Sequence, residues 1–415
     1  MNKITAPKLV LLLLCICILA FLLYFIQQPA DGWHKMEAGT EYILEGKPLT
    51  GWQDIDGFRY YFGDTGLLHT AWQQIGAHTY YFGNDGALFT GWLTQNGKQF
   101  YLRSDGSLAI GMQVIEEELY HFSPDGSFLT GLVAKDGVTL LYDDHGFLNE
   151  GWIFIDGRWY YGNENGIPLT GWQELNGLQH YFTDTGAAAD GWLALDGFDH
   201  YFYEKGIPAQ GERTIDGVVR YFASNGQHLY LVNPWHMLPE GYNVELVSIN
   251  DRYQIAEIAY ADFKDMMDAC RADGLKPVVC SAYRTYDYQN DLYQNRIKRY
   301  IQVGYSEDTA TALAGRSVAI PGTSEHQLGL ALDIVDFDYQ HLNKTPANMP
   351  TQKWLMANSW QYGWILRYPS EKSAITGIIY EPWHYRYVGK TVAAEIHELG
   401  ICLEEYLDML TISFG

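Results

Sequence analysis

Hydrophobic and aromatic positions recur every 20 residues through the middle of the chain, over nine units that begin at Gly51. Each unit holds two short aromatic-rich runs separated by a turn signal such as Asp56-Gly57, and glycine returns at one position of every unit, from Gly66 to Gly226. Short apolar runs joined by Asp-Gly predict β-hairpins. One hairpin cannot bury its own face, so we expect an all-β solenoid of stacked hairpins over residues 32–230.

A different pattern opens the chain. Residues 9–26 carry no charge and follow Lys3 and Lys8. The run is longer than a usual signal-peptide core, and no small-x-small cleavage site follows it. We interpret it as an uncleaved transmembrane anchor, with residues 1–8 as a cytoplasmic tail and the remainder of the chain outside. A cleaved signal peptide is the alternative.

The 20-residue period ends near Leu229, and helical and strand-like patterns alternate after it. The predicted helices cover residues 255–272, 288–303, 351–362 and 390–410, and the predicted strands cover 277–280, 330–335 and 381–388. This mixture predicts an α+β domain over residues 231–415, with helices packed on a small antiparallel sheet. The fold class is therefore multidomain: an anchor helix, a hairpin-repeat solenoid and a C-terminal α+β domain.

Charge and cysteine content narrow the function. The chain has 27 Lys+Arg against 50 Asp+Glu, a formal net charge of −23. This excludes a nucleic-acid partner, which needs a basic surface, and suits a cationic ligand. Outside the predicted anchor only Cys270, Cys280 and Cys402 remain, an odd number that excludes a disulfide scaffold. Free thiols or a Cys270–Cys280 bridge both remain open.

The C-terminal domain carries residues suited to a catalytic metal. His326 and Asp333 lie seven residues apart, and Glu381 precedes His384 by three. Two imidazoles and a carboxylate can hold zinc with an open fourth position, and the spare Glu381 can act as a base.

Three motifs in order resemble the VanY type of D-alanyl-D-alanine carboxypeptidase: Ser281-x-Tyr283-Arg284-(x4)-Gln289, Ser324-Glu325-His326-(x6)-Asp333, and Glu381-Pro-Trp383-His384. The resemblance implies that His326, Asp333 and His384 bind zinc and that Glu381 is the general base. It also implies that Arg284 binds the scissile carbonyl or the oxyanion formed there. The resemblance further implies that Ser281, Tyr283, Gln289 and Ser324 line the pocket and hold the terminal carboxylate of the peptide. Trp383 would form a wall of the site.

The repeats resemble the choline-binding and glucan-binding modules of Gram-positive surface proteins. In choline-binding members, aromatic rings of neighbouring hairpins cage a quaternary ammonium. The matching rings here would be Trp52, Trp72, Trp92, Trp152, Trp172 and Trp192. The opening tryptophan is replaced at Met112, Leu132 and Glu212. The rings could instead only fill the solenoid core, and the module could be a spacer.

Together these features predict a membrane-anchored zinc carboxypeptidase in the cell wall of a Gram-positive bacterium. It would remove terminal D-alanine from peptidoglycan stem peptides, with a zinc-bound water attacking the carbonyl and Glu381 as base. Its partners would be stem peptides, the membrane, and a wall polymer such as choline-bearing teichoic acid or glucan. An L,D-carboxypeptidase acting on tetrapeptide stems, an endopeptidase cutting cross-links, and a non-catalytic wall-binding protein are the alternatives.

Overall fold

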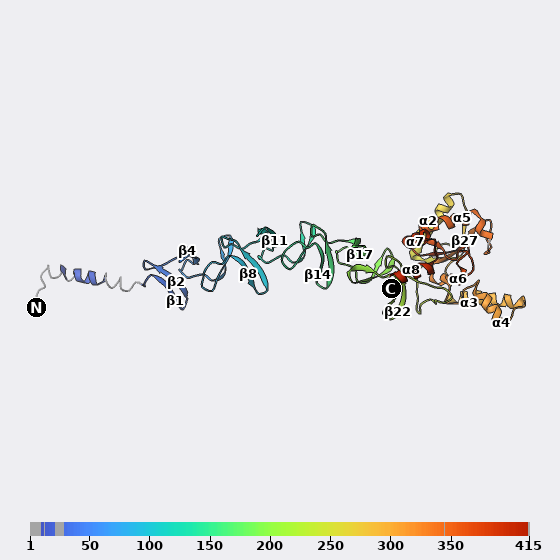
Figure 1. The fold of residues 1–415 in the computed structure, drawn as a ribbon, viewed down its shortest axis with the longest axis horizontal. Coiled ribbons are helices and arrows are strands. Elements are labelled where there is room, and N and C mark those ends of the chain that lie inside the picture. The colour runs from blue at the N-terminus through green and yellow to red at the C-terminus, as the bar shows by residue number, and fades with distance from the viewer. Residues whose placement is uncertain (1–9, 12, 21–28, 344, 414–415) are drawn as a thin grey trace. The chain divides into compact units, whose positions relative to one another are not determined.

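The computed structural model describes residues 10–11, 13–20, 29–343 and 345–413 (Figure 1). The chain divides into two compact units, Met1–Ile155 with Gly162–Pro168, and Asp156–Tyr161 with Leu169–Gly415. Much of the predicted anchor at 9–26 lies outside the described residues, although 10–11 and 13–20 are helical. Within the part of the chain described, none of the helices has the length and apolar character needed to span a membrane.

The repeats are β-hairpins, as predicted, with strands of about five residues. Their strands are β1 (Gly32–Met36), β2 (Gly39–Leu44), β3 (Lys47–Pro48), β4 (Gly51–Ile55), β5 (Phe58–Phe62), β6 (Ala71–Ile75), β7 (His78–Phe82), β8 (Gly91–Gln95), β9 (Lys98–Leu102), β10 (Gly111–Ile115), β11 (Glu118–Phe122), β12 (Gly131–Lys135), β13 (Val138–Tyr142), β14 (Gly151–Ile155), β15 (Arg158–Gly162), β16 (Gly171–Leu175), β17 (Leu178–Phe182), β18 (Gly191–Leu195), β19 (Phe198–Tyr203), β20 (Ile207–Pro208), β21 (Gly211–Ile215), β22 (Val218–Phe222) and β23 (His228–Leu229), with η1 at Glu204–Gly206. Asp56 and Gly57 both have positive φ, 51° and 85°, as a two-residue type I′ turn requires.

The recurring glycine marks the place where one hairpin rests on the previous one. A Cβ atom on Gly86 would lie 2.4 Å from Leu68 Cδ2, and one on Gly106 would lie 2.5 Å from Leu88 Cδ2. The backbone also links successive hairpins, because Leu88 N donates to Arg59 O at 2.8 Å. At Gly86, Gly106, Gly126 and Gly166 the backbone approaches a leucine of the previous unit, and at Gly66 and Gly146 it approaches Pro48 and Phe128, so the 20-residue period reflects a repeated close contact between hairpins.

The C-terminal region is built on one four-stranded antiparallel sheet in the order β26-β27-β29-β28. Its elements are β24 (Leu246–Ser248), β25 (Gln254–Ala256), η2 (Glu257–Ala259), α2 (Tyr260–Ala272), β26 (Pro277–Ser281), α3 (Tyr286–Gln302), α4 (Glu307–Gly315), η3 (Glu325–Leu328), β27 (Ala331–Asp336), η4 (Thr345–Asn348), α5 (Pro350–Asn358), η5 (Ser359–Tyr362), β28 (Trp364–Leu366), α6 (Ser373–Thr376), β29 (His384–Tyr387), α7 (Lys390–Leu399) and α8 (Leu403–Ser413). Apolar side chains of α2 and of the sheet form the main core. The α+β prediction is confirmed.

Two local predictions were wrong, and one helix was missed. The helix expected over 390–410 is two helices, because Gly400 adopts φ 66° and ends α7. The helix expected from 255 begins only at Tyr260, since the preceding residues pair as β25 with β24. Helix α4 was not predicted.

The last hairpin belongs to the same compact unit as the C-terminal region and shares a core with it. Ala223 and Leu229 are buried among residues of α7 and α8. Thr411 Oγ1 accepts a hydrogen bond from Glu212 N at 2.7 Å, and Gln227 Nε2 donates to Val388 O at 3.0 Å. Helix α8 thus packs where a following hairpin would stand, which accounts for Glu212 in the place of an opening tryptophan.

Gly211 gives a direct test of this junction. Its φ is 67°, and an added Cβ would lie 2.4 Å from Thr411 N, a backbone atom that cannot move aside alone. We expect Gly211→Ala to lower the free energy of unfolding by about 1–3 kcal/mol more than Gly217→Ala does. Gly217 is the matched control, because its φ is 76° and no atom lies within 4 Å of its Cβ position. Thermal unfolding of both variants measures the difference, and equal losses would show that α8 does not press on β21.

Candidate active site

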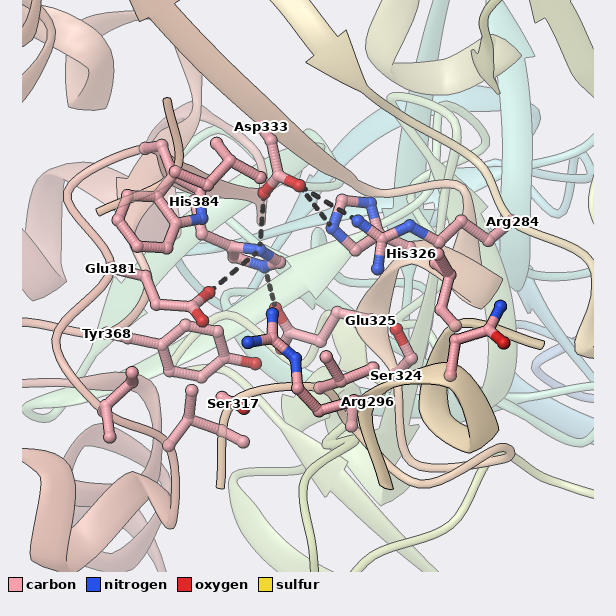
Figure 2. A pocket seen from close by; sticks show the side chains of 18 of the residues that line it. Arg284, Arg296, Ser317, Ser324, Glu325, His326, Asp333, Tyr368, Glu381 and His384 are labelled. Carbon is pink, nitrogen blue, oxygen red and sulfur yellow. Dashed lines mark hydrogen bonds and ion pairs between the residues drawn. The ribbon is translucent and has the colours of Figure 1, made fainter. Parts of the chain in front are cut away.

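Two adjacent strands and a short 3-10 helix bring three potential metal ligands together. Asp333 on β27 lies directly opposite His384 on β29 in the strand register. His326 belongs to η3, which ends at Gly329 with φ 73° before the chain enters β27. His326 Nε2 lies 3.4 Å from Asp333 Oδ2, and His384 Nδ1 lies 3.1 Å from Asp333 Oδ1 (Figure 2). All three ligand atoms fall within 4.8 Å of one another.

The hydrogen-bond partners of the two imidazoles leave one nitrogen of each facing Asp333. His326 Nδ1 is 2.8 Å from Ala282 O, so it carries the proton and Nε2 keeps its lone pair. Burial, aided by the charge of Arg284, lowers the pKa of His326 to about 4. His384 Nε2 lies 3.4 Å from Glu325 Oε2, which leaves Nδ1 for a metal. Such outer partners fix the orientation of metal-binding imidazoles.

The charges around the cluster favour a cation at its centre. Burial alone would lower the pKa of His384, but hydrogen bonds to Asp333 and Glu325 raise it to about 9. The two carboxylates therefore favour positive charge at this position. The two imidazole nitrogens and one carboxylate oxygen form the donor set that zinc prefers, so the residues present fit a zinc ion.

Glu381 stands beside this cluster as a carboxylate with a raised proton affinity. Its Oε2 lies 3.9 Å from His384 Nδ1, and the residue is 9% exposed. Burial is the main cause that raises the pKa of Glu381 to about 8. A carboxylate that takes up a proton near neutral pH suits a general base.

Arg284 points at the cluster and is held there by other side chains. Its Nη2 donates to Asp333 Oδ2 at 3.0 Å and to Ser281 Oγ at 2.8 Å. Its Nε also donates to Ser281 Oγ, at 3.0 Å, and its Nη1 donates to Gln289 Oε1 at 3.2 Å. The structure therefore places Ser281 and Gln289 behind the guanidinium, where they orient it.

The cluster opens into a pocket with a volume of about 370 Å³. This size suits a small peptide end. Of the residues that the sequence assigned to the pocket, Ser324 and Trp383 line it, together with Arg284, Glu381 and the three metal-ligand candidates. Ser281, Tyr283 and Gln289 are not among the lining residues in the described structure.

A buried ion cluster behind the site escaped the sequence analysis. Arg367 is fully buried, and its Nε donates to Glu325 Oε1 at 2.7 Å while its Nη2 donates to Glu404 Oε1 at 2.6 Å. Arg386 Nη1 reaches the same Glu325 oxygen at 2.8 Å. Glu325 in turn faces His384, so the cluster positions a metal ligand. Its only sequence signal was that Glu325 precedes His326 in the motif.

The tryptophans of the repeats touch rings of their own hairpin and of the next one. Ring centroids lie 5.1 Å apart for Trp52 and Tyr61, and 5.0 Å apart for Trp52 and Tyr80. Further contacts of this kind are Trp72 with Tyr81 and Phe100, Trp92 with Tyr101 and Tyr120, Trp172 with Tyr181 and Phe202, and Trp192 with Tyr201 and Phe222. Trp152 opens β14 in the same position.

The second ring of this pattern differs in the later repeats. The residue 28 positions after the tryptophan is Tyr80, Phe100 and Tyr120 for Trp52, Trp72 and Trp92, whereas it is His200 for Trp172 and Arg220 for Trp192. The Arg220 guanidinium carbon lies 5.2 Å from the Trp192 ring centroid, and the Arg59 guanidinium carbon lies 5.0 Å from that of Trp52. A cation of the chain thus lies over both rings, so the earlier and later groups are distinguished by the residue 28 positions on.

The chain is similar to known proteins over its C-terminal part. A family model described as VanY, D-alanyl-D-alanine carboxypeptidase, matches residues 252–390. A bifunctional D-Ala-D-Ala dipeptidase and D-Ala-D-Ala carboxypeptidase, VanXYC of Enterococcus gallinarum, is 34% identical over 196 residues, which cover 44% of this chain and 94% of that protein. The chain belongs to the VanY family.

A second curated relative and a solved structure also match the C-terminal part of the chain. A D-alanyl-D-alanine carboxypeptidase of Enterococcus faecalis (strain ATCC 700802 / V583) is 43% identical over 180 residues, 43% of this chain and 65% of that protein. The chain therefore spans slightly less than two thirds of that relative. A solved VanY D,D-pentapeptidase in complex with Zn(II) is 42% identical, with a TM-score of 0.40, and is matched over 97% of its length by 43% of this chain.

The family also bears on the cofactor, and a second family model matches the repeats. VanY enzymes are zinc peptidases, and the donor set of His326, Asp333 and His384 fits this metal, so zinc is the cofactor of the chain. A family model for a cell wall binding repeat of the choline-binding type matches residues 70–88, 90–108 and 150–167. The predicted pairing of a VanY domain with wall-binding repeats is confirmed.

Proposed function

We propose that this chain is a zinc-dependent carboxypeptidase that removes terminal D-alanine from peptidoglycan stem peptides. The observation that carries the proposal is the convergence of His326, Asp333, His384, Glu381 and Arg284 on one pocket. A buried carboxylate with a raised pKa beside three metal ligands, as at Glu381, is typical of a catalytic site and is not needed in a protein that only binds the wall.

The geometry gives each side chain a task. Zinc, when bound, supplies Lewis-acid chemistry and a water of lowered pKa. Glu381 takes up a proton at its carboxylate and returns it to the leaving amine. Arg284 offers a fixed positive charge to the carbonyl oxygen, where negative charge develops. Trp383, which is 7% exposed, forms an apolar wall of the site.

D-alanine release tests the activity. The full chain with zinc is incubated with a pentapeptide ending in D-Ala-D-Ala and with a tetrapeptide ending in one D-Ala, and a chelated sample serves as control. Release from the pentapeptide that is lost on chelation and restored by zinc is the expected result. Release only from the tetrapeptide would favour the L,D-carboxypeptidase. No release from either, with zinc bound, would contradict the proposal and direct the search to cross-linked muropeptides.

We further propose that the enzyme works outside a Gram-positive cell, with residues 9–26 as its membrane anchor and the repeats on a wall polymer. The uncharged run and the match to wall-binding repeats support this location.

The ligand of the repeats would be a quaternary ammonium, held by the three all-aromatic groups that begin at Trp52, Trp72 and Trp92. We expect leucine at these three positions to weaken binding of the full chain to immobilised choline by at least about tenfold, because each cation–π contact is worth about 1 kcal/mol. Leucine at Trp172 and Trp192 is the control and should have little effect. Equal losses in both variants would contradict this division of the repeats, and no retention of the unaltered chain would exclude choline as the ligand.

A further inference from the structure

The hydrogen bonds of Arg284 limit what else it can bind. A guanidinium has five N–H donors. Nε donates to Ser281, Nη2 donates to Ser281 and Asp333, and Nη1 donates to Gln289. These bonds leave one N–H of Nη1 for a ligand. One N–H can serve one oxygen, such as the scissile carbonyl, but it cannot form the two parallel bonds by which arginine clamps a carboxylate.

A carboxypeptidase must nevertheless hold a free carboxylate, and this step rests on the proposed function. A carboxylate that enters a pocket without a charged or hydrogen-bonding partner is strongly disfavoured. The charge of Arg284 is already engaged by Asp333 at 3.0 Å. The carboxylate therefore needs a further partner in the pocket, and a second cation would suit it best.

Helix α3 brings two arginines to the pocket, Arg296, which is part-buried, and Arg299, which is exposed. Leu292, Asn295, Arg296 and Arg299 all line the pocket, and their spacing of three, four and seven residues puts them on one face of the helix. On the opposite side, α3 packs against α4 through Tyr293 and Ile297. The pocket-facing stripe is therefore fixed by the packing of the two helices.

Arg296 is available to a ligand. Within the described residues it is part-buried and has no ion pair and no side-chain hydrogen bond, whereas Arg284, Arg367 and Arg386 all have ion pairs. It is also close to the reacting groups. Although burial dominates the raised pKa of Glu381, the positive charge of Arg296 is among those that oppose the rise. Figure 2 shows Arg296 among the side chains of this pocket.

Ser324 provides a second, independent sign of a ligand. It is 3% exposed and lines the same pocket. In the part of the chain that the structure describes, its hydroxyl makes no side-chain hydrogen bond, and η3 lacks a side-chain cap from it. Ser324 Oγ is not among the fully buried side-chain atoms without a partner, so this hydroxyl is open to the pocket, where a polar ligand group can bond to it.

We propose that Arg296, together with the Ser324 hydroxyl, binds the terminal carboxylate of the peptide, while Arg284 serves the scissile carbonyl. Arg296 is then the residue that makes the enzyme an exopeptidase, because it binds the carboxylate of a free chain end, which an internal peptide bond lacks. Ser281 and Gln289 act on the substrate only through Arg284.

A pair of peptides that differ in one group tests the assignment. Both end in D-Ala-D-Ala, one as the free acid and one as the C-terminal amide, and kcat/KM is measured for the full chain with zinc. The unaltered chain should prefer the acid by about 10- to 100-fold, the range expected for hydrogen bonds to a charged group. Arg296→Gln should remove most of this preference, mainly through KM for the acid, and Arg296→Lys should restore part of it. Lys298→Gln, which removes an exposed charge from the same helix outside the pocket lining, should leave the preference unchanged.

Binding separates failure of this assignment from failure of the proposed function. Dissociation constants for the two peptides are measured by calorimetry in the Glu381→Ala chain, with and without Arg296→Gln. Tighter binding of the acid that disappears with Arg296→Gln supports the assignment whether or not D-alanine is released. An acid-to-amide ratio that is unchanged by Arg296→Gln, or a chain that binds both peptides equally, would overturn it.

Discussion

Replacing Glu381 by glutamine is expected to lower kcat for D-alanine release by about 10³-fold. Glutamine matches the shape of glutamate, so the nearly buried site needs no repacking, but an amide cannot accept a proton. General acid–base catalysis by one side chain typically contributes 10²- to 10⁴-fold. The three ligand side chains are untouched, so the variant should retain one zinc per chain. Zinc content by elemental analysis and steady-state kinetics on the pentapeptide measure both effects.

Glu371→Gln is the matched control for Glu381→Gln. Glu371 is an exposed carboxylate outside the pocket lining, so its replacement removes the same charge without touching the site. Its kcat should stay within about twofold of that of the unaltered chain. Near-normal activity of the Glu381 variant with zinc bound would exclude Glu381 as the base.

The second large effect concerns stability. We expect Arg367→Met to lower the free energy of unfolding by about 3–5 kcal/mol, because it leaves Glu325 and Glu404 buried with less compensation. Arg367 has no exposed surface, and it donates to both carboxylates at 2.6–2.7 Å. Since Glu325 also faces His384, the variant should bind zinc more weakly. Urea unfolding and a zinc titration measure the two losses.

Lys372→Met provides the comparison for this variant. Lys372 pairs with Glu405 at 2.7 Å, but both side chains are 27% exposed. Pairs of this kind contribute about 0–1 kcal/mol. A loss for Arg367→Met no larger than the loss for Lys372→Met would mean that the buried carboxylates find other partners or take up protons.

The repeats and the metal-ligand candidates could be recognised from the sequence because their signals are local. A hairpin needs only the apolar runs and the turn residues between them, and Asp56-Gly57 supplied both. The pairing of Asp333 with His384 required more than spacing, since it depends on the register of β27 against β29. The resemblance of the sequence motifs to the VanY type indicated that these two residues meet, although the strand register itself could not be predicted.

The remainder depended on tertiary packing. Arg367 lies 42 residues from Glu325 and 37 from Glu404, so no local pattern connects them. Arg296 belongs to a helix whose position was predicted, but the face that it presents to the pocket is set by α4, which was not. The sequence also could not tell whether Ser281 and Gln289 face the substrate or a neighbouring guanidinium.

The shared core of the last hairpin limits how such a chain can change length during evolution. Loss of residues 91–110 would bring Leu88 to the place of Leu108 beside Gly126, and the stacking would be restored. Loss of residues 211–230 would instead remove Ala223 and Leu229 from the core that they share with α7 and α8. Recombination can therefore lengthen or shorten the repeat array by whole hairpins upstream, while the final hairpin is inherited with the C-terminal domain.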